Sequence, residues 1–427
     1  APPPPPLPPP PRVARPVGMS DAEADWVVRN EVTLGEGCPP PCLTFEAAHL
    51  PDGLLDAIAD AKFSSPSAIQ GAAWPAAMRG MDVVGIAKTG SGKTLAFLAP
   101  AFKRIADDRR MEQPSTLVLA PTRELALQIR DEAVKFGRPC RVNCAVLYGG
   151  APKGPQIGEL RRGAQVVVAT PGRLNDFLES AVLSVRAVTY LVMDEADRML
   201  DMGFEPQIRK IVGRLPSERQ TLMFTATWPS AVRKLASEFL RAPVQVTIGD
   251  SGKQLTANKD IVQVVEVLPS AADRDAALVR HINGLSHGAR VIIFCSTKRA
   301  CDQLSNAMAR QIGCSAIHGD KDQRERERTL ADFRSGRAPI LVATDVAARG
   351  LDIKDVRLVV NYEFPPSTED YIHRIGRTGR AGADGLAVTL MTAQDAKHAG
   401  ALIKILQDSG QRVPDALRAL AASAPSK

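Results

Sequence analysis

Residues 87–94 (AKTGSGKT) have the types and the spacing that bind the phosphates of a nucleoside triphosphate. Glycines allow backbone N–H groups to approach phosphate oxygens, Lys93 reaches the β- and γ-phosphates, and the Thr94 hydroxyl is a ligand for Mg²⁺. An apolar run, Val83–Ile86, precedes the segment and a helical pattern follows it, which is the context that the motif requires. This context outweighs the alternative of a turn without chemistry. We expect phosphate binding by Ala87, Lys88, Thr89, Gly90, Ser91, Gly92, Lys93 and Thr94.

An acidic pair follows another apolar run further along the chain, in the segment 190–197 (YLVMDEAD). An acid at the end of a buried strand beside a phosphate loop holds the hydration shell of Mg²⁺, and we assign this role to Asp194. The adjacent Glu195 is placed to orient or deprotonate an attacking water. A short acidic run alone is usually a solvated turn, but its place after a strand and a phosphate loop favours catalysis.

These two sites need a scaffold that brings the ends of buried strands together, and the rest of the sequence predicts one. Short β-branched runs alternate with helical patterns, which is typical of parallel strands joined by helices. In the first half the runs are 83–86, 117–119, 166–168, 190–193, 222–224 and 243–248. After a break at 249–254 they resume at 261–268, 291–294, 340–342, 358–360 and 387–390. We therefore expect an α/β fold with two doubly wound parallel-sheet domains and an active site between them.

Composition narrows the class of protein. The chain has 427 residues, 44% of them apolar and 24% charged, which fits two or three globular domains and argues against a collagen-like, disordered or disulfide-rich protein. No apolar run approaches the roughly 18 residues of a membrane helix, so we expect no membrane partner. Seven cysteines suit a reduced compartment. The formal net charge of +7 permits a polyanionic partner without demanding one.

The N-terminal segment differs from the rest of the chain. Ten of the 33 prolines fall within the first 16 residues, a pattern typical of polyproline II or disorder. We expect a disordered proline-rich arm over residues 1–42, either a solubilising segment, which we favour, or a ligand for proline-binding protein partners. It lacks the features of a signal peptide. The other expected boundaries are a first domain at 43–249, a linker at 250–258, a second domain at 259–412 and a C-terminal tail at 413–427.

Taken together, these motifs resemble those of the DEAD-box family of ATP-dependent RNA helicases. The sequence contains Asp194-Glu-Ala-Asp197, and motifs in the family's order run from Phe45 to Met391. Segments such as 224–229 (FTATWP) are most similar to the Dbp-two-like and p-sixty-eight-like branch. The resemblance implies two tandem RecA-like domains, ATP and Mg²⁺ as cofactors, and RNA-stimulated ATP hydrolysis. It also implies that domain closure bends single-stranded RNA, separates short duplexes or remodels RNA–protein complexes.

The resemblance adds residues to the ATP site. Gln70 reads the adenine edge with the donor and the acceptor of its amide, and Phe63 stacks on the ring. Asp352 contacts the ribose. Arg377 and Arg380 are arginine fingers for the γ-phosphate, a role that suits the permanent charge and planar fork of arginine.

By the same resemblance, another set of residues contacts RNA through sugar and phosphate, with little sequence preference. These are Thr122, Arg123, Gly150, Thr170, Arg173, Gly319, Gln323, Arg326 and Thr344. The residues expected to couple hydrolysis to domain closure are Asp197, Thr225, Thr227 and His373. Departures from the family pattern are Lys62 for Gly, Ser67 for Thr and Thr225 for Ser, and both hydroxyl groups are kept.

Two other functions share this fold. One is an ATP-gated RNA clamp, which the intact Glu195, Arg377 and Arg380 disfavour. The other is a DNA helicase, which a comparison of stimulation by RNA and by DNA separates, because contacts with 2′-hydroxyl groups distinguish the two. We expect a monomer in the nucleus or cytoplasm, and the branch resemblance favours the nucleus.

Two cysteine pairs and two histidines suggest metal binding at first sight. The pairs have three intervening residues and no further ligands at zinc spacing, so we do not assign a zinc site to them. The histidines lie inside motifs and are interpreted as interdomain hydrogen-bonding positions. These residues are Cys38 and Cys42, Cys140 and Cys144, and His318 and His373.

Overall fold

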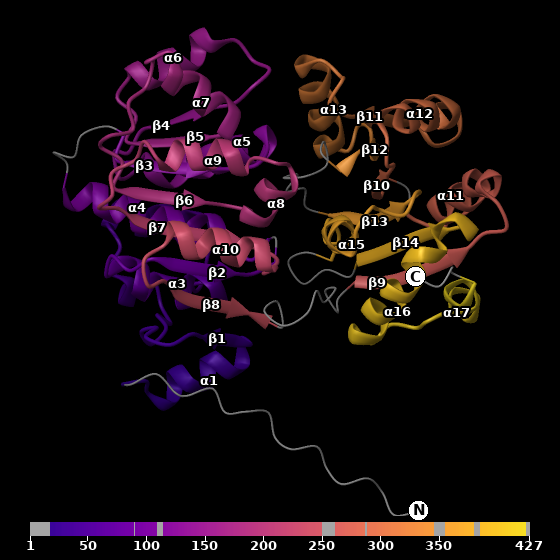
Figure 1. Ribbon diagram of the computed structural model, residues 1–427, viewed down its shortest axis with the longest axis horizontal. Helices are drawn as coiled ribbons and strands as arrows, with labels where there is room; N and C mark the ends of the chain where they lie inside the picture. The colour runs from indigo at the N-terminus through magenta and orange to yellow at the C-terminus, as the bar shows by residue number, and fades with distance from the viewer. Residues whose placement is uncertain are drawn as a thin grey trace, which may run out of the picture.

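A computed structural model describes residues 18–88, 90–108, 114–249, 261–286, 288–345, 355–379 and 385–423. These residues form two α/β domains that lie side by side, the first ending at residue 249 and the second beginning at residue 261 (Figure 1). The proline tract of residues 1–17 and the expected linker at 250–258 fall outside the described ranges. So do three expected site residues, Thr89, Asp352 and Arg380.

The first domain is built on an eight-stranded sheet. Its strands are parallel except for β1, which pairs antiparallel with β8 at one edge. In spatial order they are β1 (Val32–Leu34), β8 (Val244–Ile248), β2 (Val83–Ile86), β7 (Gln220–Thr225), β6 (Tyr190–Met193), β3 (Thr116–Leu119), β5 (Val166–Ala169) and β4 (Cys144–Leu147). The five central strands are buried along their whole length because helices cover both faces, which explains their uninterrupted apolar runs.

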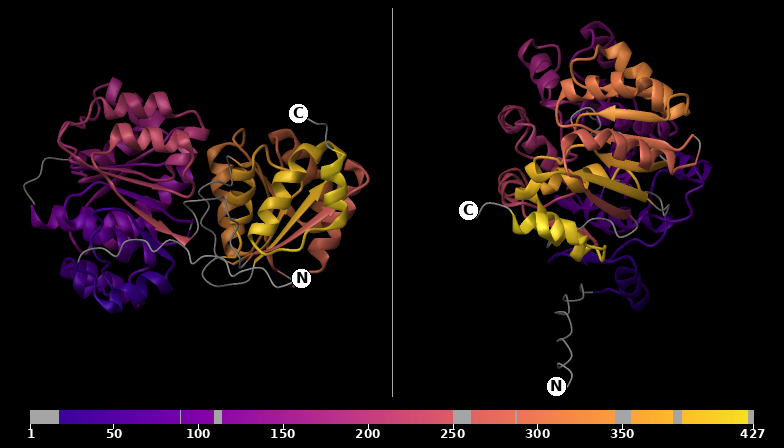
Figure 2. Two further views of the ribbon diagram at one scale, coloured as in Figure 1. Left: turned by 60° about the horizontal axis from the view of Figure 1, so that its bottom comes forward. Right: turned by 90° about the vertical axis from the view of Figure 1, so that its right-hand side faces the viewer.

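Helices cover this sheet on both faces, and the left view of Figure 2 shows the sheet between two helical layers. One apolar core lies under α2 (Asp52–Asp60), α3 (Ala68–Met78), α4 (Lys93–Asp107) and α5 (Arg123–Gly137). The other lies under α7 (Pro171–Glu179), α8 (Ala196–Asp201), α9 (Glu205–Val212) and α10 (Ser230–Phe239). The domain also contains α1 (Asp21–Arg29), the 3₁₀ helix η1 (Glu46–Ala48) and α6 (Lys153–Arg161).

The second domain has a six-stranded sheet that is parallel throughout. Its spatial order is β11 (Cys314–Ile317), β12 (Ile340–Ala343), β10 (Arg290–Phe294), β13 (Val356–Asn361), β14 (Gly385–Met391) and β9 (Ile261–Val267). Its helices are η3 (Ala271–Asp273), α11 (Arg274–Asn283), α12 (Lys298–Ile312), α13 (Gln323–Ser335), α15 (Thr368–Ile375), η4 (Ala393–Asp395), α16 (Ala396–Asp408) and α17 (Asp415–Ala422). No helix in the described ranges is both long and apolar enough to cross a bilayer.

The expected fold, two parallel-sheet α/β domains, is confirmed. The strands at Val83–Ile86 and Tyr190–Met193 have the predicted bounds, and the other nine predicted strands differ by at most two residues at either end. Strands β4 and β11 were not predicted. Their sequences, CAVL and CSAI, are short and contain small residues, so they lack the β-branched run on which the other assignments rested.

Part of the segment 1–42 is folded, which corrects the expectation of a disordered arm over its whole length. Helix α1 begins at a capping box, in which Ser20 N–H donates to the Glu23 carboxylate at 2.7 Å. Strand β1 follows and buries Val32 and Leu34 against the sheet. The first domain therefore includes residues before 43, because a paired edge strand and a capped helix offset the entropy of ordering them.

The expected tail at 413–427 also needs correction. Residues 415–422 form α17, which packs on α16 through the buried side chains of Leu417 and Leu420. Leucines three residues apart lie on one face of a helix, and this pattern was overlooked in an alanine-rich segment. The second domain therefore extends past residue 412.

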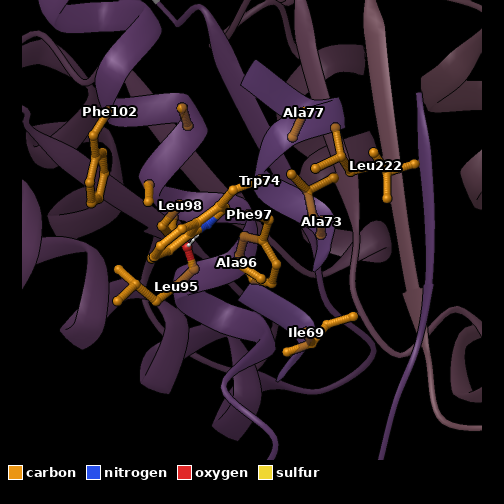
Figure 3. Packing of buried hydrophobic residues seen from close by; sticks show 14 of the residues in the cluster. Ile69, Ala73, Trp74, Ala77, Leu95, Ala96, Phe97, Leu98, Phe102 and Leu222 are labelled. Atoms are coloured by element: carbon orange, nitrogen blue, oxygen red, sulfur yellow. Dashed lines mark hydrogen bonds between the residues drawn. The ribbon is translucent and has the colours of Figure 1, made fainter. Parts of the chain in front are cut away.

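The packing of α3 against α4 ties two segments of the expected ATP site into one rigid unit. Trp74 on α3 is fully buried, and its indole N–H donates to the backbone oxygen of Leu95 on α4 at 3.4 Å (Figure 3). Phe97 and Leu98 on α4 belong to the same core. Helix α3 carries Gln70 and α4 begins at Lys93, so their relative position is fixed by the core.

At two edge strands, β4 and β9, side chains of the same domain form hydrogen bonds with backbone N–H and C=O groups. At the end of β4, the Gln156 amide accepts from Tyr148 N–H at 3.2 Å and donates to Tyr148 O at 3.1 Å. Within β4, Val146 N–H donates to the carboxylate of Glu159 at 3.1 Å. At β9, Gln263 N–H donates to the side-chain oxygen of Gln411 at 3.0 Å.

Candidate functional site

The glycine-rich loop joins β2 to α4 as the motif requires. Gly90 and Gly92 have φ angles of 78° and 89°, a left-handed region that side chains other than hydrogen rarely tolerate. Lys93 is the first residue of α4, and its Nζ donates to the backbone oxygen of Ala87 at 2.8 Å. The lysine therefore spans the loop and holds its ammonium group inside it. The N-terminus of α4 adds N–H groups that favour an anion at this position.

Gln70 lies directly against the glycine-rich loop. Its amide nitrogen donates to Gly92 O at 3.0 Å, and its amide oxygen accepts from Ser67 N–H at 3.0 Å. A Cβ atom on Gly92 would approach the Gln70 amide nitrogen to 2.8 Å, so the glycine is needed for this contact. A side-chain amide has two donor and two acceptor sites, and one of each is left for a further group.

Phe63 presents an apolar ring at the surface of the first domain. Its side chain is 48% exposed, and one ring face is stacked on Phe136 with a centroid distance of 6.2 Å. An exposed ring that is held by a second ring is suited to stacking on a planar ligand.

The acidic pair follows β6. Asp194 is buried, and this burial raises the pKa of its carboxyl from 3.8 to about 7, although the charge of Lys93 acts in the opposite direction. Glu195 has φ 51° and ψ 51°, a left-handed conformation that costs energy for a residue other than glycine. Its N–H donates to Asp194 Oδ1 at 3.0 Å. Backbone strain of this kind is concentrated at functional sites.

Mg²⁺ fits the donor set at this position. Hydroxyl and carboxylate oxygens are the ligands that it prefers, and Thr94 and Asp194 supply one of each. The raised pKa of Asp194 marks a carboxylate whose charge is incompletely compensated by the protein, and a bound cation would compensate it. In the described part of the chain, no cluster of three or more His, Cys, Asp or Glu side chains is arranged to hold a metal by itself.

The four cysteines of the two pairs are free thiols. Burial raises the pKa of Cys38 to about 11 and that of Cys144 to about 12. Zinc binds thiolates, and these environments favour the protonated thiol, so they suit packing better than metal binding.

Asp197 connects the acidic turn to the residues that follow β7. Its Oδ2 accepts from Thr227 N–H at 2.9 Å and from the Thr227 hydroxyl at 2.7 Å. The Thr225 hydroxyl donates to Thr227 O at 2.8 Å. His373 of the second domain lies 3.8 Å from the same carboxylate oxygen. The structure thus brings together all four residues that were expected to couple hydrolysis to closure.

The second domain presents α15 and the turn after it to the first domain. Arg377 is buried, and its Nε donates to His373 O at 3.2 Å. Arg374, which the sequence did not single out, is the most constrained side chain of this segment. It donates to both carboxylate oxygens of Asp345, at 2.6 and 2.8 Å, and to Glu363 O at 2.7 Å. This network fixes α15 on its own sheet.

The expected RNA contacts of the first domain lie at the starts of α5 and α7. Thr122 caps α5 by accepting from Leu125 N–H at 3.2 Å. Arg123 donates to Gly149 O and lies over the Tyr148 ring. Burial and the nearby charge of Arg326 lower the pKa of Arg123. The proximity of these two positive charges favours the binding of a polyanion.

The other expected contacts of this domain are grouped close to these. Gly150 adopts φ 74° beside Arg123. Thr170 precedes α7, and Arg173 donates to Ala151 O at 2.9 Å.

The expected RNA contacts of the second domain lie at strand ends and at α13. Thr344 follows β12 and is buried, and Gly319 follows β11 in the turn that leads to α13. Gln323 is the first residue of α13. Arg326 donates to Glu124 of the first domain, so the expected phosphate contact is engaged in an interdomain ion pair. His318 pairs within its own domain, with Nε2 3.0 Å from Asp302 Oδ2, which differs from the interdomain position expected for it.

Three residues at the interface were missed by sequence reasoning. Glu124 pairs with Arg326, and Arg198 pairs with Asp370 of α15 at 2.8 Å. Glu124 lies inside a motif segment, and Arg198 directly follows one. The sequence could therefore have indicated that both residues lie near the site. Their partners are separated from them by 202 and 172 positions, and pairing over such separations has no signature in a single sequence.

Three features define the class of protein: a phosphate-binding loop, a buried acidic turn, and a second domain whose helix α15 reaches that turn. It is a P-loop protein with two RecA-like domains. Comparisons with known proteins agree at the level of the family. The sequence model of the DEAD/DEAH box helicase matches residues 67–235, and the model of the helicase conserved C-terminal domain matches residues 273–382. The chain belongs to the DEAD-box helicase family.

Curated relatives cover nearly the whole chain. DEAD-box ATP-dependent RNA helicase 14 of Arabidopsis thaliana is 58% identical over 397 residues, which are 92% of this chain and 64% of the relative. ATP-dependent RNA helicase DBP2 of Candida glabrata is 49% identical over 407 residues, 93% of this chain and 74% of the relative. The expected similarity to the Dbp-two-like branch is confirmed. The chain spans 64%, 61% and 49% of the length of three plant relatives.

Two solved structures differ in their overall similarity to this chain. Dbp5 of S. cerevisiae bound to RNA and ADP BeF3 is 30% identical, with a TM-score of 0.77 over 89% of this chain and 99% of that one. Prp28 from Chaetomium thermophilum bound to ADP is 38% identical, with a TM-score of 0.52 over 95% of this chain and 99% of that one.

Proposed function

We propose that this chain is an ATP-dependent RNA helicase, in which RNA-stimulated ATP hydrolysis is coupled to closure of the two domains. The observation that carries the proposal is the contact between Asp197 and His373, which joins the acidic turn of one domain to helix α15 of the other. The better match to the RNA-bound and nucleotide-bound Dbp5 than to ADP-bound Prp28 supports a closed arrangement. Hydrolysis would then reopen the interface and release the RNA.

In this mechanism the first domain binds ATP and the second completes the site. Lys93 neutralises the β- and γ-phosphates, and Gln70 and Phe63 hold the adenine. Glu195 takes a proton from a water whose oxygen attacks the γ-phosphorus, and the bond to the β–γ bridging oxygen breaks. Arg377 approaches the γ-phosphate on closure, together with Arg380 by resemblance. Thr94 and Asp194 would hold Mg²⁺, which supplies charge neutralisation on the phosphates.

RNA binding in this mechanism uses both domains. Arg123 and Arg173 face the backbone phosphates from the first domain, and residues near Thr344 and Gly319 do so from the second. Arg326 positions Glu124 and the neighbouring Arg123 across the interface, in addition to any phosphate contact. A strand held through its sugar and phosphate groups on both domains is bent when the domains close, and a bent strand leaves an A-form duplex.

The test is RNA-stimulated ATPase activity of purified protein. Lys93→Ala and Glu195→Gln are expected to lower the stimulated rate at least about 100-fold, because each removes a group that acts on the reacting phosphate. Lys153→Ala is the matched control, since Lys153 is an exposed lysine of the same domain paired with Asp176. Full activity in either site variant would refute the proposal. Equal stimulation by DNA would point to a DNA helicase, and slow turnover with long-lived RNA complexes to a clamp.

We further propose that the protein acts as a monomer in the nucleus. The similarity to the Dbp-two-like branch supports the compartment. Sedimentation velocity at micromolar concentration checks the oligomeric state, and a dimer there would contradict it. Microscopy of a tagged chain checks the compartment, and exclusion from the nucleus would contradict it.

A further inference from the structure

An arginine directly after the acidic turn is shared between two carboxylates, one in each domain. Arg198 is 2% exposed, and its Nη1 donates to Asp370 Oδ1 at 2.8 Å and to Asp201 Oδ2 at 3.3 Å. Asp370 lies on α15 of the second domain and is 15% exposed, whereas Asp201 ends α8 of the first domain and is 50% exposed. The pair with Asp370 is therefore a nearly dry ion pair across the interface.

The carboxylate of Asp370 is held in place by its own helix. The Ser367 hydroxyl donates to Asp370 Oδ2 at 2.9 Å, and Asp370 N–H donates to the Ser367 oxygen at 3.0 Å. This is the N-cap of α15. One carboxylate oxygen thus binds the cap and the other faces Arg198, so the ion pair reports the position of the whole helix rather than that of a loose side chain.

Two contacts fix the position of α15 relative to the acidic turn. Residues 370 and 373 are three apart and share a face of the helix, and they meet two consecutive residues of the first domain, Arg198 and Asp197. Arg377 follows on the same segment and is bonded to His373 O. Displacing the Asp370 end of the helix would therefore displace Arg377, which we proposed above to approach the γ-phosphate.

Asp201 gives Arg198 a partner in its own domain when the domains separate. A buried charge that loses its only partner is strongly destabilising, and this cost would resist opening. Asp201 remains within reach of Arg198. When the domains separate, the guanidinium therefore keeps one carboxylate partner, Asp201, after it has lost Asp370. The arrangement suits an interface that opens and closes in every cycle.

We propose that Arg198 is a positioning residue that latches the closed state by moving between Asp201 and Asp370. The proposal rests on the proposed helicase function and deepens it, since the latch links RNA-driven closure to the placement of Arg377. Arg198 touches neither ATP nor RNA in this view. It acts through the position of α15.

The test compares two variants, each of which lacks one carboxylate partner of Arg198. The latch predicts that they shift the half-saturating RNA concentration in opposite directions. Asp370→Asn weakens the closed state, so the RNA concentration that half-saturates the ATPase should rise about tenfold or more. Asp201→Asn weakens the open state, so the same concentration should fall about twofold or more. Binding of a fluorescent ADP in the absence of RNA should be unchanged in both, because the ADP site lies in the first domain.

Controls separate the latch from a general effect of charge or folding. Glu266→Gln removes a carboxylate that pairs with Arg280 and His281 inside the second domain, and it should leave RNA saturation unchanged. Asp370→Glu keeps the charge and should recover most of the affinity lost in Asp370→Asn. If Asp370→Asn melts well below the wild type, Asp201→Asn alone decides the question through its opposite sign.

The outcomes distinguish the latch from the function on which it rests. A wild-type chain without RNA-stimulated ATPase refutes the proposed function itself. A normal wild type with Asp370→Asn within twofold of it refutes the latch alone. A shift of Asp201→Asn in the same direction as Asp370→Asn also refutes the latch, because a merely structural ion pair predicts loss in both.

Discussion

Asp194 carries its charge in an environment that penalises it. Its side chain is buried, and the backbone N–H of Glu195 and the charge of Lys93 only partly offset the desolvation. Such a penalty in the ligand-free protein is typical of a residue selected for function rather than for stability. The cost is recovered when a cation binds, which couples occupation of the site to the stability of the first domain.

This penalty predicts that Asp194→Asn stabilises the ligand-free protein in a pH-dependent way. The pKa of Asp194 rises from 3.8 in the unfolded chain to about 7 in the fold, so the folded state holds the proton more tightly. Below about pH 4 both states are protonated and no penalty exists; it develops as the pH rises towards 7 and is complete above it. Asparagine cannot ionise. The variant should therefore gain about 4 kcal/mol in free energy of unfolding at pH 8 and less than half of that, about 1.5 kcal/mol, at pH 5.

Urea unfolding of nucleotide-free protein at the two pH values measures this difference. The comparison is internal, since the same two proteins are studied under both conditions. An equal gain at pH 5 and pH 8 would contradict burial of the charge as the cause. RNA-stimulated ATPase of the variant should be lost at both pH values.

At the scale of elements, the N-terminal segment supports the helix that carries Gln70. Gly71 on α3 is approached by Trp26 of α1 and by the backbone at Cys42, whose N–H donates to Gly71 O at 2.7 Å. A Cβ at Gly71 would lie 2.6 Å from Cys42 O and 3.0 Å from the Trp26 ring. This close approach explains the glycine in the middle of a helix, where it would otherwise be unfavourable.

Gly71→Ala is therefore expected to push the N-terminal segment away from α3. The free energy of unfolding should fall by about 1–3 kcal/mol through overpacking, and the KM for ATP should rise because the neighbouring Gln70 shifts. Gly158→Ala in the middle of α6 is the matched control, since nothing lies within 4 Å of its added Cβ. That variant should gain about 0.4–1 kcal/mol. Thermal unfolding and ATPase assays decide, and equal behaviour of the two variants would contradict the contact.

The elements show which parts of the fold the sequence predicts. Strands such as Val83–Ile86 were predictable because full burial on both faces demands an uninterrupted apolar run. Strand β4 was not, because an outer strand needs fewer large side chains and its CAVL sequence has only two. Strand β1 was hidden as well. Its three residues are paired by β8, more than two hundred positions away, and a three-residue alternation is too short to stand out.

The residues of the site also divide into those that the sequence predicts and those that it does not. The loop at Lys93 and the turn at Asp194 follow from local spacing, since each stands at the end of a strand with its own apolar run. The roles of Gln70 and Arg377 came from resemblance. The partnership of Arg198 with Asp370 could not be predicted, because it depends on how two separately folded domains meet.

At the scale of the whole molecule, the two domains are separate folding units that meet through polar groups. In the ranges that the structure describes, each of the apolar core clusters draws its residues from one domain. The contacts across the interface are polar: Arg198 with Asp370, Arg326 with Glu124, and His373 with Asp197. An interface of this kind is more polar than a core and favours relative motion of the domains.

The separate cores predict two unfolding transitions in calorimetry of the ligand-free chain. A non-hydrolysable ATP analogue alone should raise the midpoint of the first domain and leave that of the second within about 1 °C, because a ligand stabilises only the unit that binds it. Addition of single-stranded RNA should raise both and bring them together. A single transition without ligands, with equal calorimetric and van't Hoff enthalpies, would contradict independent folding.

The glutamine and glutamate side chains along β4 and β9 have a consequence for crowded conditions. An outer strand with free N–H and C=O groups is a template on which a second chain adds a strand, and repeated addition gives fibres. Gln156, Glu159 and Gln411 already occupy several of these groups from within the chain. These two edges are therefore poorer templates for strand addition, which lowers the tendency of closely spaced copies to join through them.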